Sequence, residues 1–137
     1  MLFNIVLPTS IPLLWQESAW NAYFVCFALR YAVGLNITWT VNSVAHIWGN
    51  RPYDKNINPA ENMFVSIGTM GEGYHNYHHT FPYDYRASEF SLKMNPTAIF
   101  IDFFAWIGWA YEKKTVSKEA IYRKMQRSGE KADQKNN

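Results

Sequence analysis

The pattern of hydrophobic and polar positions divides the chain into an apolar N-terminal third and a more polar remainder. Residues 1–15 are apolar, are interrupted by Pro8 and Pro12, and are too few to cross a bilayer, so we interpret them as the end of a membrane helix. Residues 19–48 contain no proline and one glycine, Gly34, which predicts a single helix about 45 Å long. Because a hydrocarbon core is about 30 Å thick, this helix can cross a bilayer and project into water.

Shorter elements are predicted after this long helix. Residues 49–62 are rich in turn formers and charges, and we expect them to form a water-facing loop. Residues 62–70 and 74–81 are short helix candidates, whereas residues 83–95 are polar and irregular. Residues 96–111 are strongly apolar but too short for a membrane span, so they either pack on the rest of the chain or lie in the membrane interface.

Charge supports a membrane location for the first third. Glu17 and Arg30 are the two charged side chains of residues 1–50, and all the others follow. A charged side chain is unfavourable in lipid, so Arg30 needs a protein partner or must reach the interface. The formal net charge of +2 is too balanced for a nucleic-acid-binding protein, and 48% hydrophobic residues exclude a disordered chain. A single cysteine, Cys26, excludes an internal disulfide and a cysteine-based zinc module.

The C-terminal segment is basic. Residues 112–137 contain eight Lys or Arg residues and four Asp or Glu residues. We expect an amphipathic helix at its start and disorder at its end. A basic segment after a membrane span favours the cytosolic side. This helix could dock a partner or could be a solvated helix with no partner.

Three histidines within five residues carry the strongest chemical signal. His75, His78 and His79 have the i, i+3, i+4 spacing that places side chains on one face of a helix. Neutral imidazole is a good ligand for iron, zinc and copper. Three imidazoles held together without a metal would repel one another when protonated. The spacing therefore predicts a metal site, with a solvated histidine cluster as the alternative.

A fourth histidine, His46, lies near the end of the long helix. Asn42 precedes it by four residues, so both side chains project from the same helix face. An asparagine in this position could hold a metal-bound water or orient a ligand. By itself, a single helical histidine is equally consistent with a structural role.

Three segments together resemble the membrane acyl-CoA desaturases of the stearoyl-CoA (delta-9) family, with an insect-like character. They are the Asn42-to-His46 pair, residues 49–55 (GNRPYDK) and residues 71–82 (GEGYHNYHHTFP). The resemblance extends from about residue 1 to residue 129. The family has two earlier histidine boxes, HxxxxH and HxxHH, whereas this chain has no histidine before His46. We therefore expect a C-terminal portion of such an enzyme that is inactive alone.

The resemblance implies an all-α fold, a fragment of a membrane helical bundle. Residues 1–48 would contain the end of one transmembrane helix and a long transmembrane helix projecting into the cytosol. Residues 49–112 would form a cytosolic iron-binding region with the third histidine box, and residues 113–137 a basic tail. The implied location is the endoplasmic reticulum membrane, with several spans and a cytosolic C-terminus.

The resemblance also implies a non-haem diiron site that uses O2 to insert a double bond into a saturated acyl-CoA. The implied iron ligands are His46, His75, His78 and His79, with Asn42 acting through a water and the remaining ligands in the missing boxes. Thr38 and Trp39 correspond to positions that line the acyl tunnel or the thioester region. Cytochrome b5 and its NADH-dependent reductase would supply electrons, and the basic tail could dock cytochrome b5. The implied partners therefore include acyl-CoA and membrane lipid, but no nucleic acid.

Two alternatives without catalysis remain open. A small histidine-based zinc or iron module could use three or four imidazoles in a tetrahedral site. A truncated regulatory product could instead pack against full-length desaturase subunits.

Overall fold

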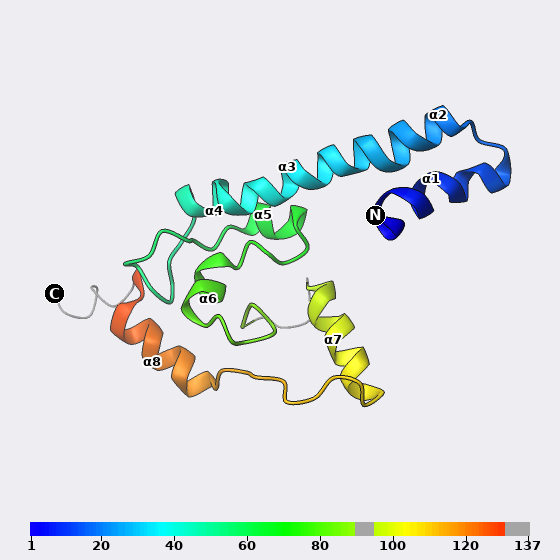
Figure 1. Ribbon diagram of the computed structural model, residues 1–137. Helices are drawn as coiled ribbons and strands as arrows, with labels where there is room; N and C mark the ends of the chain where they lie inside the picture. Colours follow the sequence, from blue (N-terminus) through cyan, green and yellow to red (C-terminus); the bar gives the residue numbers. More distant parts are fainter. Residues whose placement is uncertain (90–94, 131–137) are drawn as a thin grey trace. The chain divides into compact units, whose positions relative to one another are not determined.

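A computed structural model describes residues 1–89 and 95–130 of the chain, which divides into two compact units, Met1–Thr38 and Trp39–Asn137 (Figure 1). Regular structure in the described residues is helical, apart from isolated β-bridges that join Glu61 to Asn50 and to Tyr74. The predicted all-α fold is confirmed.

The first unit contains a helical segment, Leu2–Trp15, and the start of a second one. The first segment changes its hydrogen-bonding pattern near Pro8 and Pro12, because proline has no N–H to donate. Gln16 then adopts a left-handed conformation with φ 66°, and the Ser18 hydroxyl accepts a hydrogen bond from the Asn21 N–H to start the second segment. The successive elements are η1 (Leu2–Val6), α1 (Leu7–Ser10), η2 (Ile11–Trp15), α2 (Ala19–Asn21), η3 (Ala22–Leu29) and α3 (Arg30–Asn42).

Arg30 has protein partners within this unit. Its guanidinium Nη2 donates to the Asn4 carbonyl oxygen at 2.7 Å and to Asn4 Oδ1 at 2.8 Å, and its Nε donates to the Cys26 carbonyl oxygen at 2.9 Å. These bonds join the two helical segments, since α1 and η1 also pack on η3. The protein partner that the sequence requires for this charge is therefore present.

The long helix predicted over residues 19–48 runs from Ala19 to Ile47. Within the described residues it is the one helix that is long and apolar enough to cross a membrane, judged by length and composition. It is interrupted at Ser43, where α3 gives way to α4 (Val44–Ile47). The Ser43 hydroxyl donates to the Trp39 carbonyl oxygen at 2.6 Å, a local bond of the kind that bends helices.

The second unit packs its helices around two small apolar cores. The first core joins the loop after α4 to α6 (His75–Thr80) and α8 (Lys118–Ser128). The second core joins the end of α3 to α4 and α5 (Met63–Gly68). Helices α5, α6 and α8 confirm the helices predicted over residues 62–70, over residues 74–81 and at the start of the basic segment. The apolar segment 96–111 also begins with a helix, α7 (Pro96–Trp106). The core residues are Tyr53, Tyr77, Phe81, Val116 and Ile121 in the first cluster and Val41, Ala45 and Val65 in the second.

The loop over residues 49–62 is only partly water-facing. Tyr53, Pro59 and Ala60 are buried, whereas the other residues of the predicted water-facing loop are exposed or half-buried. Tyr53 enters the first core because its ring packs edge-on against Tyr77, with 5.1 Å between the ring centroids. The disorder expected at the end of the tail concerns residues 131–137, which lie outside the described residues.

Asp84 is a buried hydrogen-bond acceptor for three segments. Its carboxylate accepts from the Tyr77 hydroxyl at 2.8 Å and from the Val116 N–H at 2.9 Å, and it pairs with the Arg86 guanidinium at 2.5 Å. The Asp84 side chain is fully buried, whereas that of Arg86 is 22% exposed. This carboxylate therefore ties α6 to the segment that leads into α8.

We expect Asp84→Ala to lower the free energy of unfolding by about 3 kcal/mol, because it leaves buried donors without an acceptor. The matched control is Asp102→Ala, since the pair between Asp102 and Lys113 is about one-third exposed. That change should lower the free energy of unfolding by less than about 1 kcal/mol. Urea unfolding of the detergent-solubilised chain measures the free energy of unfolding of both variants. Equal decreases in the two variants would contradict the stabilising role of the buried Asp84 carboxylate.

Candidate metal centre

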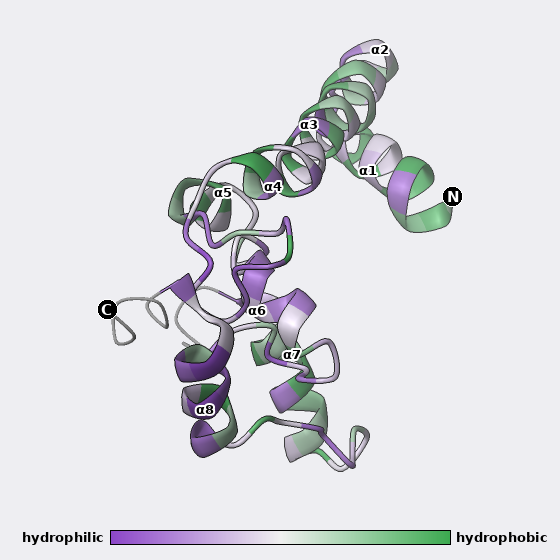
Figure 2. Ribbon diagram, turned by 90° about the vertical axis from the view of Figure 1, so that its left-hand side faces the viewer, coloured by the Kyte–Doolittle hydropathy of each residue, from purple (hydrophilic) through white to green (hydrophobic). Residues whose placement is uncertain are grey.

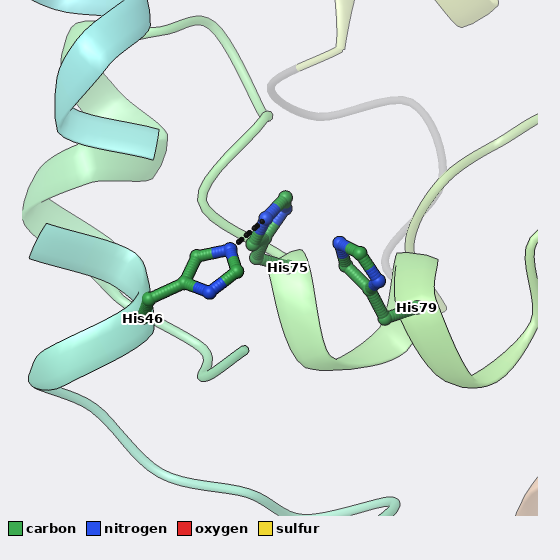
Figure 3. Close-up of side chains that lie close together, drawn as sticks. All are labelled: His46, His75 and His79. Carbon is green, nitrogen blue, oxygen red and sulfur yellow. Dashed lines mark hydrogen bonds between the residues drawn. The ribbon is translucent and has the colours of Figure 1, made fainter. Parts of the chain in front are cut away.

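Three histidines from two helices converge in the second unit (Figure 3). His46 lies in the last turn of α4, and His75 and His79 lie one turn apart on α6. One ring nitrogen from each lies within 4.8 Å of the others, and the Nε2 atoms of His46 and His75 are 2.9 Å apart. We call His46, His75 and His79 the histidine triad.

The triad is open on one side. His75 is 8% exposed, His46 is half-buried and His79 is exposed. A metal site that keeps an accessible side has room for a further ligand, whereas structural zinc sites are closed.

His78 lies beside the triad. Its ring centroid is 6.2 Å from that of His75 and 5.6 Å from that of His79, and its side chain is exposed. The i, i+4 spacing thus brings His75 and His79 together, as the sequence predicts, but the i+3 member does not join them. His46 instead completes the group from a helix 29 residues earlier. The ligand role of all four histidines stays a prediction.

The remaining predicted site residues lie on α3. Asn42 is exposed and is the last residue of α3, whereas His46 lies on α4, beyond the interruption at Ser43. Trp39 is 58% exposed. The Thr38 hydroxyl donates to the Gly34 carbonyl oxygen at 2.9 Å, within the first unit. Contact of these side chains with a substrate stays a prediction.

Asn76 fixes the position of α6 and was not identified from the sequence. Its side-chain Oδ1 accepts from the N–H groups of Tyr53 and Asp54 at 3.0 Å and 3.1 Å. Its Nδ2 donates at 2.9 Å to the carbonyl oxygens of Asp54 and Pro59. Asn76 is fully buried and is the neighbour of His75 in the sequence. Its four hydrogen bonds therefore connect the helix that carries His75 to the loop before α5. An asparagine between two histidines gives no signal of this role in the sequence.

Glu61 and Gly73 also position α6, and neither was identified from the sequence. Glu61 Oε1 accepts a hydrogen bond from the Tyr77 N–H at 2.7 Å, near the start of α6. Burial raises the pKa of Glu61 to about 7. Gly73 allows a close backbone approach, because a Cβ there would lie 2.2 Å from the Ser66 nitrogen.

Burial favours the neutral form of His75 and His79. The pKa of His75 falls to about 4, first because burial disfavours the charged form and then because protonated His79, His46 and His78 would repel it. The pKa of His79 is also lowered, by burial and then by repulsion from His78 and His46. Neutral imidazole is the form that binds a metal. Three imidazole nitrogens on an open site fit a borderline transition metal such as iron or zinc.

Comparison with known proteins shows which proteins the chain resembles. No protein-family model matches the chain. Stearoyl-CoA desaturase 5 of Bos taurus is 53% identical over 131 residues, which are 95% of this chain and 39% of that protein. Acyl-CoA Delta-9 desaturase of Acheta domesticus is 55% identical over 127 residues, 91% of this chain and 35% of that protein. Stearoyl-CoA desaturase of Homo sapiens is 53% identical over 131 residues, 95% of this chain and 36% of that protein. The chain thus spans well under two thirds of the length of these relatives and matches their C-terminal part.

In the metal-free protein, we expect NMR titration to give His75 a midpoint near pH 4, because burial opposes protonation. The midpoint of His79 should lie below 6.5. His46→Asn should raise both values, since it removes one source of repulsion from each ring. A His75 midpoint at its usual value of 6.5 would contradict the buried position of this ring.

We expect Asn76→Ala to weaken Zn²⁺ binding by the chain about tenfold or more, because it frees the helix that carries His75 without removing a ligand. Asn56→Ala is the matched control, since the Asn56 side chain is exposed and bonds to Asp54 in the same loop. Isothermal titration calorimetry at neutral pH measures both affinities. Equal Zn²⁺ affinities in the two variants would show that Asn76 does not position the triad.

Proposed function

Because this chain is homologous over nearly its whole length to the C-terminal part of the stearoyl-CoA desaturases, we propose that it forms the corresponding part of a membrane acyl-CoA desaturase. In this proposal it contributes histidine ligands to a non-haem diiron centre. The observation that carries the proposal is the histidine triad, which gathers three imidazoles at one open site in a chain with these relatives.

The reaction explains why such a site is needed. The C–H bonds of a saturated acyl chain are too strong for acid–base side chains to break, so a metal cofactor must supply the oxidising chemistry. The proposed task of the chain is to hold that cofactor through His46, His75 and His79. His78 adjoins the triad on α6 and is proposed as a further ligand. Asn42, the last residue of α3, is proposed to bind through a water molecule.

The geometry around the triad supports this role. His75 stays neutral because it is buried, so its ring nitrogen remains available to a cation at neutral pH. Glu61 holds α6 by accepting a hydrogen bond from a backbone N–H of the helix, and Asn76 holds it by bonding to the loop before α5. Fixed ligands lose less conformational freedom when a metal binds, which favours binding.

The proposed substrate is a saturated acyl-CoA, after the names of the relatives. Thr38 and Trp39 are proposed to line its path. We also propose that the helix Ala19–Ile47 spans the endoplasmic reticulum membrane as one of several spans, with the C-terminus in the cytosol. The basic C-terminal segment supports this orientation, because Lys and Arg are enriched on the cytosolic side.

Cytochrome b5 and its NADH-dependent reductase are the proposed electron donors. The basic segment could attract an acidic partner, but part of its charge is already paired within the chain. Lys113 pairs with Asp102, and Lys124 pairs with Asp54, each at 2.6 Å. Arg123 is therefore a better candidate for such a contact than either lysine, because its described hydrogen bond is to a backbone oxygen of its own helix.

A second candidate function is metal binding without catalysis. One observation favours it, since the triad comes together within a single unit of this chain. This alternative predicts metal binding without acyl-CoA desaturation in any context, including a hybrid that contains the rest of a desaturase.

The test is a hybrid in which this chain replaces the matching C-terminal part of Bos taurus stearoyl-CoA desaturase, expressed in desaturase-deficient cells. We expect the hybrid to form unsaturated acyl chains, as measured by gas chromatography. His46→Ala, His75→Ala and His79→Ala should each abolish the product, because each removes a proposed ligand. Asp102→Ala, at an exposed ion pair, should leave the product unchanged.

Normal product from the His75→Ala hybrid would contradict the proposal. His78→Ala tests the resemblance separately, because this side chain lies outside the triad. We expect that variant to lose activity as well, whereas full activity would limit the ligands of this chain to the triad.

A further inference from the structure

We propose that α7 lies in the membrane interface, with one side of the helix in contact with lipid acyl chains. This side, the lipid-facing stripe, consists of Ile99, Phe100, Phe103, Trp106 and Ile107. The inference concerns a surface away from the histidine triad and does not rest on the proposed desaturation.

The stripe is continuous and exposed. Its residues follow the i, i+1, i+4, i+7, i+8 spacing of one helix side. Phe100 is 64% exposed and Trp106 is 82% exposed. Large contiguous apolar surfaces of this kind are rare on monomeric soluble proteins and mark a contact with a partner or a membrane.

The opposite side of α7 is fixed to the second unit. Ala98 is fully buried, and Asp102 accepts a hydrogen bond from the Tyr85 hydroxyl at 2.8 Å. Asn95 begins the helix by accepting from the Ala98 N–H at 3.0 Å and donates to the Arg86 carbonyl oxygen at 2.9 Å. These contacts set the rotation of the helix about its axis, so the stripe faces away from the residues that hold it.

The length of α7 and the residues that follow it favour lipid as the partner of the lipid-facing stripe. The helix has 11 residues, so at about 1.5 Å per residue it is too short to span a bilayer and must lie along its surface. Exposed Trp109 and Tyr111 follow it, and Lys114 comes soon after. Tryptophan and tyrosine favour the membrane interface, and lysine side chains reach lipid phosphates from it.

The neighbouring helix α8 provides the contrast. It has the same number of residues, but its apolar residues Ile121 and Met125 pack in the first core and its other side is charged. Figure 2 shows α7 hydrophobic over much of its length and α8 largely hydrophilic. The outward side of α8 therefore suits water, whereas that of α7 does not. Tyr122 on α8 is an exposed aromatic residue outside any such stripe and serves as a reference position.

The experiment compares two single-tryptophan forms of the full chain in phosphatidylcholine vesicles. One retains Trp106, with the other tryptophans replaced by phenylalanine. The other carries Tyr122→Trp, with all native tryptophans replaced. Lipids brominated near the headgroup quench tryptophans at the interface, and aqueous iodide quenches those in water. Circular dichroism verifies that both variants keep their helices.

We expect brominated lipid to reduce the fluorescence of Trp106 much more than that of the tryptophan at position 122, and iodide to do the reverse. Bromine near the end of the acyl chains should quench Trp106 less than bromine near the headgroup, because an interfacial helix enters only about 5–10 Å. Quenching of Trp106 by iodide alone would overturn the proposal. Protection from both quenchers would also overturn it, since a protein partner would then cover the stripe.

A second measurement avoids the tryptophan replacements. Phe103→Cys in a Cys26→Ser background carries a nitroxide label on the lipid-facing stripe. Oxygen concentrates in lipid and a nickel chelate stays in water, so we expect oxygen to relax the label more strongly. Stronger relaxation by the nickel chelate would overturn the proposal.

Discussion

The side-chain amide of Asn76 holds together the segments on which the candidate metal centre depends. It accepts from the N–H groups of Tyr53 and Asp54 and donates to the carbonyl oxygens of Asp54 and Pro59. These four bonds use the full hydrogen-bonding capacity of a fully buried amide. A six-residue helix such as α6 is not stable by itself. The orientation of His75 therefore depends on long-range bonds, most of them made by its neighbour.

The two sides of α6 have different functions. His75 and His79 face His46, and Tyr77 lies between them in sequence. Two residues correspond to about 200° of rotation around a helix, so Tyr77 points to the opposite side and packs with Phe81 in the first core. Apolar packing on one side thus supports polar chemistry on the other. His75 is itself buried, which lowers its pKa and keeps it available as a ligand.

Pairing of charges decides which surfaces remain open to partners. The buried carboxylate of Asp84 serves as an acceptor for Arg86 and two other groups, and Asp54 and Asp102 take up lysines of the basic segment. The basic character read from the sequence is therefore smaller on the surface than the count of residues suggests. The most prominent open surface on α7 and α8 is instead apolar, the lipid-facing stripe.

The sequence by itself determined the features that depend on local periodicity. These include the long helix over residues 19–48 and the shared side of His75 and His79. The chain's motifs gave the resemblance to desaturases, which implied the all-α fold. Only the tertiary structure decided that His46 meets His75 across 29 residues, that His78 lies outside the triad and that Tyr53 turns inward. The reason is physical: helix geometry fixes neighbours three or four residues apart, whereas contacts between distant segments depend on packing and on buried hydrogen bonds.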